Sequence, residues 1–162
     1  MACSFSRPLL SDGISLRVWA DASQNIHVSL SNQGDRSYFM LIGGLCNGLG
    51  TPAFQFVLRR NGNTDPLMLS YNSPGVICGN PDLWTVYLPV RSQYEFTFSP
   101  TELRLEHHMR QSLTDLKNSS YTLEVKYSVN FSGRFNPLVS HGIKADRSWW
   151  QGELTTNLVH RM

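Results

Sequence analysis

Residues 121–129 read Tyr-Thr-Leu-Glu-Val-Lys-Tyr-Ser-Val, so an apolar side chain occupies every second position. Successive side chains of a β-strand point to opposite faces, and this period of two places all the apolar side chains on one face. A second segment, Trp150-Gln-Gly-Glu-Leu-Thr-Thr-Asn157, follows after a long polar loop. We predict that the two segments are the paired closing strands of a β-sandwich.

Similar short segments recur along the chain, separated by turn-forming residues. Alternating or apolar patterns cover residues 14–18, 26–30, 54–58, 67–71, 83–88 and 94–98. The continuous apolar run at residues 38–42 predicts a strand that is buried on both faces or lies in the centre of a sheet. Seven to nine short strands with this spacing predict an all-β fold, a sandwich of two antiparallel sheets.

One segment departs from the strand pattern. Ser99-Pro-Thr-Glu102 has the residues of a helix start, with Ser as the cap, Pro at the first helical position and Glu three residues after the cap. Four apolar residues then follow at helical spacing: Leu105, Met109, Leu113 and Leu116. We therefore predict one short helix near residues 100–116.

Length and composition bound the remaining choices. A chain of 162 residues fits an N-terminal extension at residues 1–12 and a single sandwich domain at residues 13–162. Its net charge of +2 is too near balance for a basic surface that binds nucleic acid. No apolar run approaches the roughly 20 residues that a membrane-spanning helix needs.

Cys46 and Cys78 lie in loops that also contain glycine, where two backbones can approach closely. The spacing predicts a disulfide between them, which would indicate an oxidising compartment. Two reduced thiols that pack as small apolar side chains are the alternative. Likewise, either the protein is cytoplasmic or the sequence begins after a removed export signal.

The closing strands carry a resemblance. The late strand reads Tyr-x-Leu-x-Val-x-Tyr from Tyr121, and the last strand reads Trp-x-Gly-x-x-x-Thr-Asn from Trp150. With these motifs, and over roughly residues 14–159, the chain resembles uncharacterised microbial immunoglobulin-like modules, many of them exported. It departs from the usual motifs at Ser120 and Thr156. The resemblance implies an immunoglobulin-like sandwich in the extracellular space or cell envelope, and it implies no activity.

A search for catalytic and metal-binding motifs identifies no candidate of the expected geometry. The five histidines include no pair spaced i, i+4, and there is no Cys-x-x-Cys. Ser140, His141 and Asp146 supply the residue types of a catalytic triad, but three neighbours in one loop rarely converge. We therefore predict no enzyme, no metal site and no cofactor.

Binding is the better prediction, and it centres on Trp149. Trp150 shares the parity of Leu154 and Leu158, which predicts that Trp150 is buried and that Trp149 faces outward. An outward indole close to Phe131, Arg134 and Phe135 would suit a protein or glycan ligand. Alternatively, Phe131 and Phe135 fold over Trp149 as a satellite of the core.

The sequence patterns leave two functions open. The first is a non-catalytic interaction module that binds a protein or glycan through loops at one end of the sandwich. The alternative is a peptidase inhibitor that presents the loops at residues 43–52 and 72–82.

Overall fold

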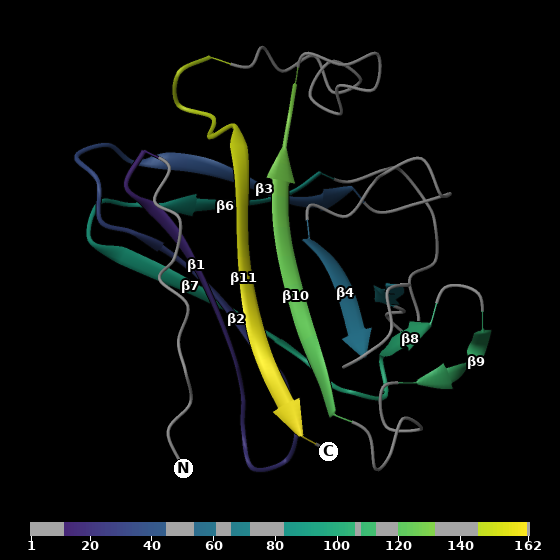
Figure 1. Cartoon of the computed structure of the whole chain (residues 1–162). Coiled ribbons are helices and arrows are strands. Elements are labelled where there is room, and N and C mark those ends of the chain that lie inside the picture. Colours follow the sequence, from purple (N-terminus) through teal and green to yellow (C-terminus); the bar gives the residue numbers. More distant parts are fainter. Residues whose placement is uncertain are drawn as a thin grey trace.

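The computed structural model describes residues 12–44, 54–60, 66–71, 83–105, 108–112, 120–131 and 146–161. These residues form eleven β-strands and no helix, so none of them belongs to a helix that could cross a membrane (Figure 1). The strands are β1 (Ile14–Ala20), β2 (Ile26–Asn32), β3 (Tyr38–Gly44), β4 (Phe54–Arg60), β5 (Leu67–Tyr71), β6 (Leu83–Leu88), β7 (Ser92–Phe98), β8 (Leu103–Leu105), β9 (His108–Ser112), β10 (Ser120–Val129) and β11 (Gly152–Arg161).

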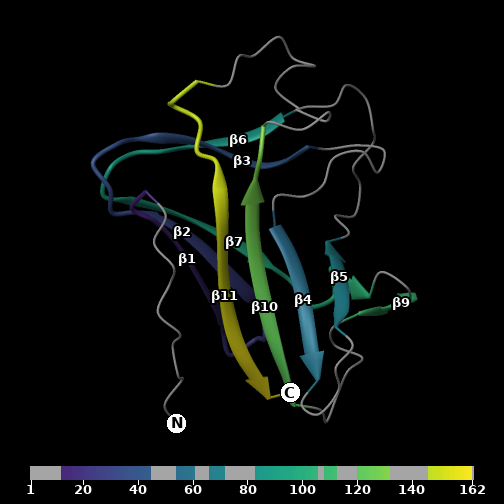
Figure 2. The same cartoon turned by 45° about the horizontal axis from the view of Figure 1, so that its top comes forward.

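The strands form three sheets, and all their ladders are antiparallel. One sheet has the order β1-β2-β7, the second has the order β11-β10-β4-β5-β8-β9, and the third is the pair β3-β6. Figures 1 and 2 show the long strands of the six-stranded sheet in one layer and the two smaller sheets behind it. Side chains from all three sheets share one hydrophobic core. The predicted all-β, antiparallel architecture is confirmed, but the described residues form three sheets where two were predicted, because β3 and β6 pair only with each other in their ladder.

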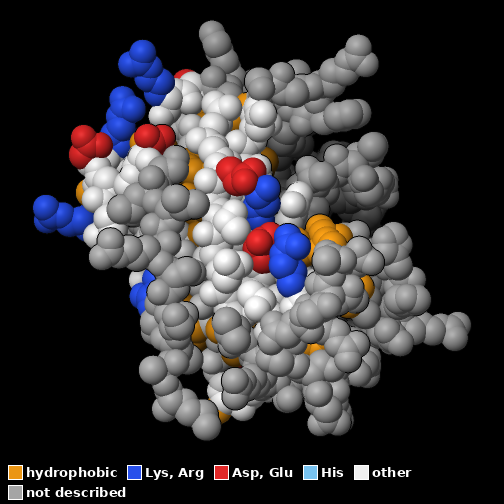
Figure 3. Space-filling view, viewed as in Figure 1, with side chains coloured by type: hydrophobic (Ala, Val, Ile, Leu, Met, Phe, Trp, Pro, Cys, Tyr) orange, Lys and Arg blue, Asp and Glu red, His pale blue; other side chains and the backbone are white. Residues whose placement is uncertain are grey.

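Strand β10 has one buried and one solvated face, as its alternation predicts. Its five apolar side chains, from Tyr121 to Val129, are at most 5% exposed. On the outward face, Arg59 Nη2 lies 3.7 Å from Glu124 Oε1, and Lys126 Nζ lies 2.9 Å from Glu153 Oε1. Figure 3 shows acidic and basic side chains alternating along the middle of this face. Polar pairing across β4, β10 and β11 therefore accounts for the charged positions of the pattern.

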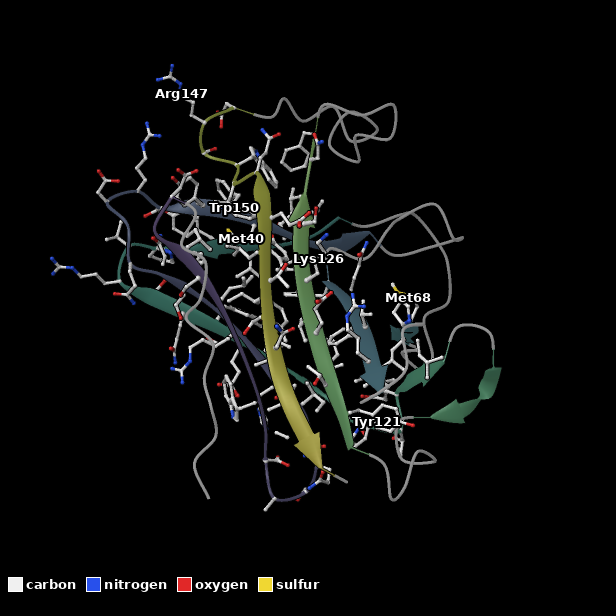
Figure 4. All side chains as sticks on the ribbon, viewed as in Figure 1. Met40, Met68, Tyr121, Lys126, Arg147 and Trp150 are labelled. Carbon is white, nitrogen blue, oxygen red and sulfur yellow. The ribbon has the colours of Figure 1, made fainter. Side chains whose placement is uncertain are left out.

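A hydrogen bond through the core links the two layers. The Tyr127 hydroxyl on β10 donates to the backbone oxygen of Leu41 on β3 at 2.8 Å. Trp150 stacks on the Tyr127 ring, with centroids 5.3 Å apart, and is itself 1% exposed. Burial raises the pKa of Tyr127, so the hydroxyl keeps its proton and remains a donor. The predicted burial of Trp150 is confirmed, and Figure 4 labels Trp150 and Met40, which both belong to the hydrophobic core.

The prediction of a helix near residues 100–116 is wrong. Within the described part of this segment, residues 103–105 form β8 and residues 108–112 form β9. One bond of the predicted cap exists, since Glu102 Oε2 accepts from the Ser99 amide at 3.0 Å, but the Glu102 amide donates to the Ser99 backbone carbonyl at 3.0 Å and not to the Ser99 hydroxyl. They close a single turn. The chain then pairs with β5 and buries Leu103 completely, so a strand partner and a core position outweigh local helix propensity.

Strand β3 also differs from its prediction. It pairs with β6 alone in its ladder and so does not lie in the centre of a sheet, and its burial on both faces is incomplete at Phe39. Tyr38, Met40, Leu41 and Ile42 are buried, whereas Phe39 is 38% exposed. The described residues form eleven strands. Nine of them lie outside the segment predicted to be a helix, and nine is the upper end of the predicted range of seven to nine.

Candidate functional site

Three aromatic side chains, Phe39, Tyr87 and Trp149, lie together on the outer side of β3 and β6. We call them the aromatic surface. Phe39 and Tyr87 are directly opposite each other in the β3–β6 register, and their ring centroids are 5.1 Å apart at an interplanar angle of 47°. Because side chains alternate along a strand, the burial of Met40 and Val86 directs these two rings outward. Tyr87 is 55% exposed, which makes it the most accessible ring of the surface.

The third ring reaches the surface through a short backbone contact. The Phe39 amide donates to the Ser148 carbonyl at 2.7 Å, and the Trp150 amide donates to the Phe39 carbonyl at 3.1 Å, forming an isolated parallel bridge. This extended backbone turns Trp150 into the core. It places Trp149 beside Phe39, with ring centroids 5.4 Å apart.

Trp149 is half-buried rather than fully outward. Phe131, which is 7% exposed, meets the Trp149 ring edge-on with centroids 5.8 Å apart. Phe131 therefore packs against Trp149, which is what the alternative of a satellite of the core predicts for Phe131. Arg134 and Phe135, the other predicted binding residues, lie outside the described residues.

A turn at Asp146 positions the bridge. The Asp146 carboxylate accepts a hydrogen bond from the Ser148 amide at 2.8 Å and a second from the Ser148 hydroxyl. These bonds, the hydroxyl first, lower the pKa of Asp146. Asp146 therefore fixes a local turn. Its proposed triad partners, Ser140 and His141, lie outside the described residues.

Several other predictions fall on residues that are not described. The Cys46–Cys78 disulfide is one of them, and it stays a prediction. The loops proposed for a peptidase inhibitor are another: all of residues 72–82 and all but the first two residues of 43–52 lie outside the described ranges.

Next to the aromatic surface is an open hollow of about 740 Å³. It is lined by three short segments: Asp12 and Gly13 before β1, residues 33–36 after β2 with Tyr38 at the start of β3, and Val90 and Arg91 between β6 and β7. Tyr38 and Arg91 are close in sequence to Phe39 and Tyr87, respectively. The two features therefore occupy neighbouring parts of the molecule.

A buried asparagine holds the segments of the hollow together. Asn32 is completely buried, and its side-chain nitrogen donates to the carbonyls of Arg36 at 2.7 Å and Leu88 at 3.1 Å. Its side-chain oxygen accepts from the Gly34 amide at 3.0 Å. One side chain thus ties the β2–β3 connection to the end of β6. The sequence pattern around Asn32 indicated only a turn, so its structural role was missed.

Two glycines allow the remaining wall to form. A Cβ atom on Gly13 would lie 2.3 Å from the Gly34 Cα, so only glycine permits this approach. Gly13 also has φ +76°, in the left-handed region that glycine tolerates best. Its carbonyl accepts from the Gln33 amide at 2.8 Å. The hollow is consequently built from backbone that is closely packed and hydrogen-bonded.

A separate charged cluster on the outer face of β1, β2 and β7 centres on His27. Its Nδ1 lies 2.8 Å from Glu95 Oε1, its Nε2 lies 3.1 Å from Asp21 Oδ2, and its ring stacks on Trp19 at 5.2 Å. The bond with Asp21 is the largest cause of the raised pKa of His27. Bonds from Asn25 and then His27 lower the pKa of Asp21 to about 2. Two carboxylates on the two nitrogens favour the doubly protonated ring.

The His27 cluster lacks the arrangement of a catalytic triad or a metal site. Asp21 contacts Nε2, and the Thr97 hydroxyl at 3.3 Å from Nδ1 shares that nitrogen with Glu95, which lies closer at 2.8 Å, so the hydroxyl does not have the nitrogen to itself as a triad nucleophile would. The carboxylates lie at opposite nitrogens and do not surround one point. Within the described ranges, no group of three or more His, Cys, Asp or Glu side chains could hold a metal ion. The sequence pattern gave no sign of the cluster because Glu95 is 68 residues from His27.

No family model, no curated protein and no solved structure matches the chain.

Proposed function

We propose that the protein is a non-catalytic interaction module that binds a protein or glycan through the aromatic surface. The observation that supports this most directly is the exposure of adjoining rings: Phe39 is 38% and Tyr87 is 55% exposed, they contact each other, and Phe39 also contacts Trp149. Aromatic side chains contribute much binding energy per residue because they bury a large rigid surface on contact.

Substitution of one exposed ring tests the proposal. Tyr87→Ala removes the most exposed member without changing a core side chain, and Tyr94→Ala is the matched control because Tyr94 is a 41% exposed tyrosine on β7. We expect ligands selected from a glycan array and a displayed peptide library to bind Tyr87→Ala at least about tenfold more weakly. Tyr94→Ala should bind them like the unchanged protein. Equal binding by all three proteins would contradict the proposal.

We further propose that the sandwich is immunoglobulin-like. In such domains strands A, B and E lie together in one sheet, and strands G, F and C lie together in the other. We take β1, β2, β4, β6, β7, β10 and β11, in chain order, as strands A to G. The orders β1-β2-β7 and β11-β10-β4 then match A-B-E and G-F-C. Strand β6, which this assignment makes strand D, is paired with β3 instead of β7. An experimental structure in which β1, β2 and β7 do not face β4, β10 and β11 would contradict the assignment.

A further inference from the structure

We propose that the hollow beside the aromatic surface binds a carboxylate of a partner protein, with Arg36 and Arg91 as its ligands. The proposal rests on the proposed function, because the hollow and the aromatic surface adjoin through Tyr38–Phe39 on one strand and through the end of β6 on the other. It adds the chemical class of the partner: an acidic side chain next to apolar ones.

The two arginines are available for such a ligand. Both side chains are exposed, and they come from different turns that line the same hollow. The four ion pairs found among the described residues involve other side chains, so no described carboxylate lies within 4.0 Å of either guanidinium. A planar guanidinium binds a carboxylate through two parallel hydrogen bonds, which makes this anion its natural partner.

The backbone that carries the arginines is held in place before any ligand binds. Asn32 bonds the Arg36 carbonyl directly, and the Ser37 hydroxyl accepts from the Val90 amide at 3.2 Å, one residue before Arg91. Arg91 itself has φ +58°, a left-handed conformation that side chains other than glycine adopt reluctantly. The surrounding contacts must hold such a conformation in place, and a preformed site loses less entropy when it binds.

The other charged side chains of the hollow limit the charge of the anion that it can bind. Asp12 and Asp35 line the same hollow, so its four charged side chains sum to zero. Asp12 and Asp35 would repel a multivalent anion such as phosphate more strongly than a single carboxylate, because the repulsion scales with the charge of the ligand. A group with one negative charge is therefore the better match.

The neighbouring rings favour a protein over an acidic glycan. Phe39 is tilted by 47° from Tyr87 and by 33° from Trp149, so the three rings do not form one flat platform for a sugar face. Tilted rings leave gaps into which a partner's side chains can insert. Tyrosine, tryptophan and arginine are also the residues that dominate protein–protein binding energy.

Matched small probes test the carboxylate site on the full chain. We would titrate N-acetylaspartate amide and, as the neutral control, N-acetylasparagine amide while recording amide chemical shifts. Gly34, Val90 and Arg91 line the hollow, and their signals should move with the acidic probe and not with the neutral one. Arg36→Gln and Arg91→Gly should each weaken the acidic probe about fivefold, the effect of losing one exposed ion pair.

The control variants separate the site from the fold. Arg91→Gly removes the charge and relieves the positive φ, so its unfolding temperature should stay equal or rise while binding weakens. Arg147→Gln alters an exposed arginine outside the hollow, which Figure 4 shows projecting away from the molecule, and should bind the probe unchanged. Asp35→Asn should bind it at least as tightly as the unchanged protein.

Three results would overturn the proposal. Equal shifts with both probes, or with neither, would exclude a carboxylate site. Unchanged affinity in Arg36→Gln and Arg91→Gly would exclude these ligands. Tighter binding of glucuronate than of N-acetylaspartate amide would make the partner an acidic glycan. Tyr87→Ala should not affect the acidic probe, so failure of this site and failure of the aromatic surface can be told apart.

Discussion

His27→Gln should destabilise the protein in mildly acidic solution and have little effect in alkaline solution. The imidazole contacts a carboxylate from the β1–β2 turn on one nitrogen and a carboxylate from β7 on the other. Glutamine is neutral at every pH, so it cannot replace the charged ring between Asp21 and Glu95. The variant therefore removes the pH-dependent part of these contacts and retains a polar side chain on β2.

The expected size follows from exposure. The His27 side chain is 16% exposed, but its partner Glu95 is 41% exposed, so solvent weakens their attraction. Ion pairs with this exposure contribute roughly 0.2–1 kcal/mol. With the stacking of Trp19 on the ring included, we expect His27→Gln to cost about 1 kcal/mol at about pH 5.5. In a chain of this length, that loss lowers the unfolding temperature by about 2–4 °C.

The direction of the pH effect comes from the pKa values. His27 has a raised pKa in the folded protein, so its contribution is complete below the ordinary value of 6.5 and is lost as the pH rises through the folded value. Asp21 has a pKa lowered from 3.8 to about 2, so its contribution is present above 3.8 and is lost as the pH falls toward 2. The contacts are therefore strongest between pH 3.8 and 6.5.

Thermal unfolding at about pH 5.5 and about pH 9 measures the effect in both proteins. The difference between the unchanged protein and His27→Gln should shrink at the higher pH. Glu95→Gln, which keeps the shape and removes one of the two carboxylates, should give a smaller pH dependence. A histidine signal that titrates below 6.5 by NMR, or a destabilisation that is the same at both pH values, would refute the reasoning.

Other substitutions test the core and the backbone contacts. Tyr127→Phe removes the hydrogen bond from the Tyr127 hydroxyl to the buried Leu41 carbonyl. It should lower the free energy of unfolding, measured with denaturant, by about 1–3 kcal/mol. An unchanged midpoint would show that the carbonyl finds another donor. Gly13→Ala adds a Cβ that meets backbone at 2.3 Å and φ +76°, so we expect a loss above about 2 kcal/mol, with Gln33→Ala as a neighbouring control that should change little. Leu103→Ala should cost about 2–5 kcal/mol by the same measurement because Leu103 is fully buried; a loss below about 0.5 kcal/mol would argue against the burial of β8.

The strands could be predicted where local pattern and burial agree. The alternation in residues 121–129 predicted one buried face correctly, since β10 has the core on one side and ion pairs on the other. At residues 100–116 the local signal failed: the Ser99–Glu102 bonds suit both a helix start and a single turn, and pairing with β5 decided between them. Local propensity cannot foresee which strand edge a segment will meet.

The sites were harder to predict because they depend on register. Phe39 and Tyr87 become neighbours only when β3 pairs with β6, and Phe39 was hidden within a continuous apolar run. Trp149 was identified by its parity with Trp150, a local relation, although its contact with Phe131 leaves it half-buried. Asn32 and His27 act through partners that are distant in sequence, so nothing near them in the chain distinguishes them from ordinary turn or surface residues.

The backbone of Phe39 has a consequence for self-association. An edge strand with unpaired amides and an apolar outer face invites a second chain to add a strand, which leads to aggregation. At Phe39 the amide and the carbonyl are both already bonded, to Ser148 and Trp150 respectively. Residues 148–150 therefore occupy the edge of β3 at Phe39, whose aromatic side chain faces outward. The Phe39 ring can therefore stay exposed while the adjacent main chain is unavailable for pairing with another copy of the chain.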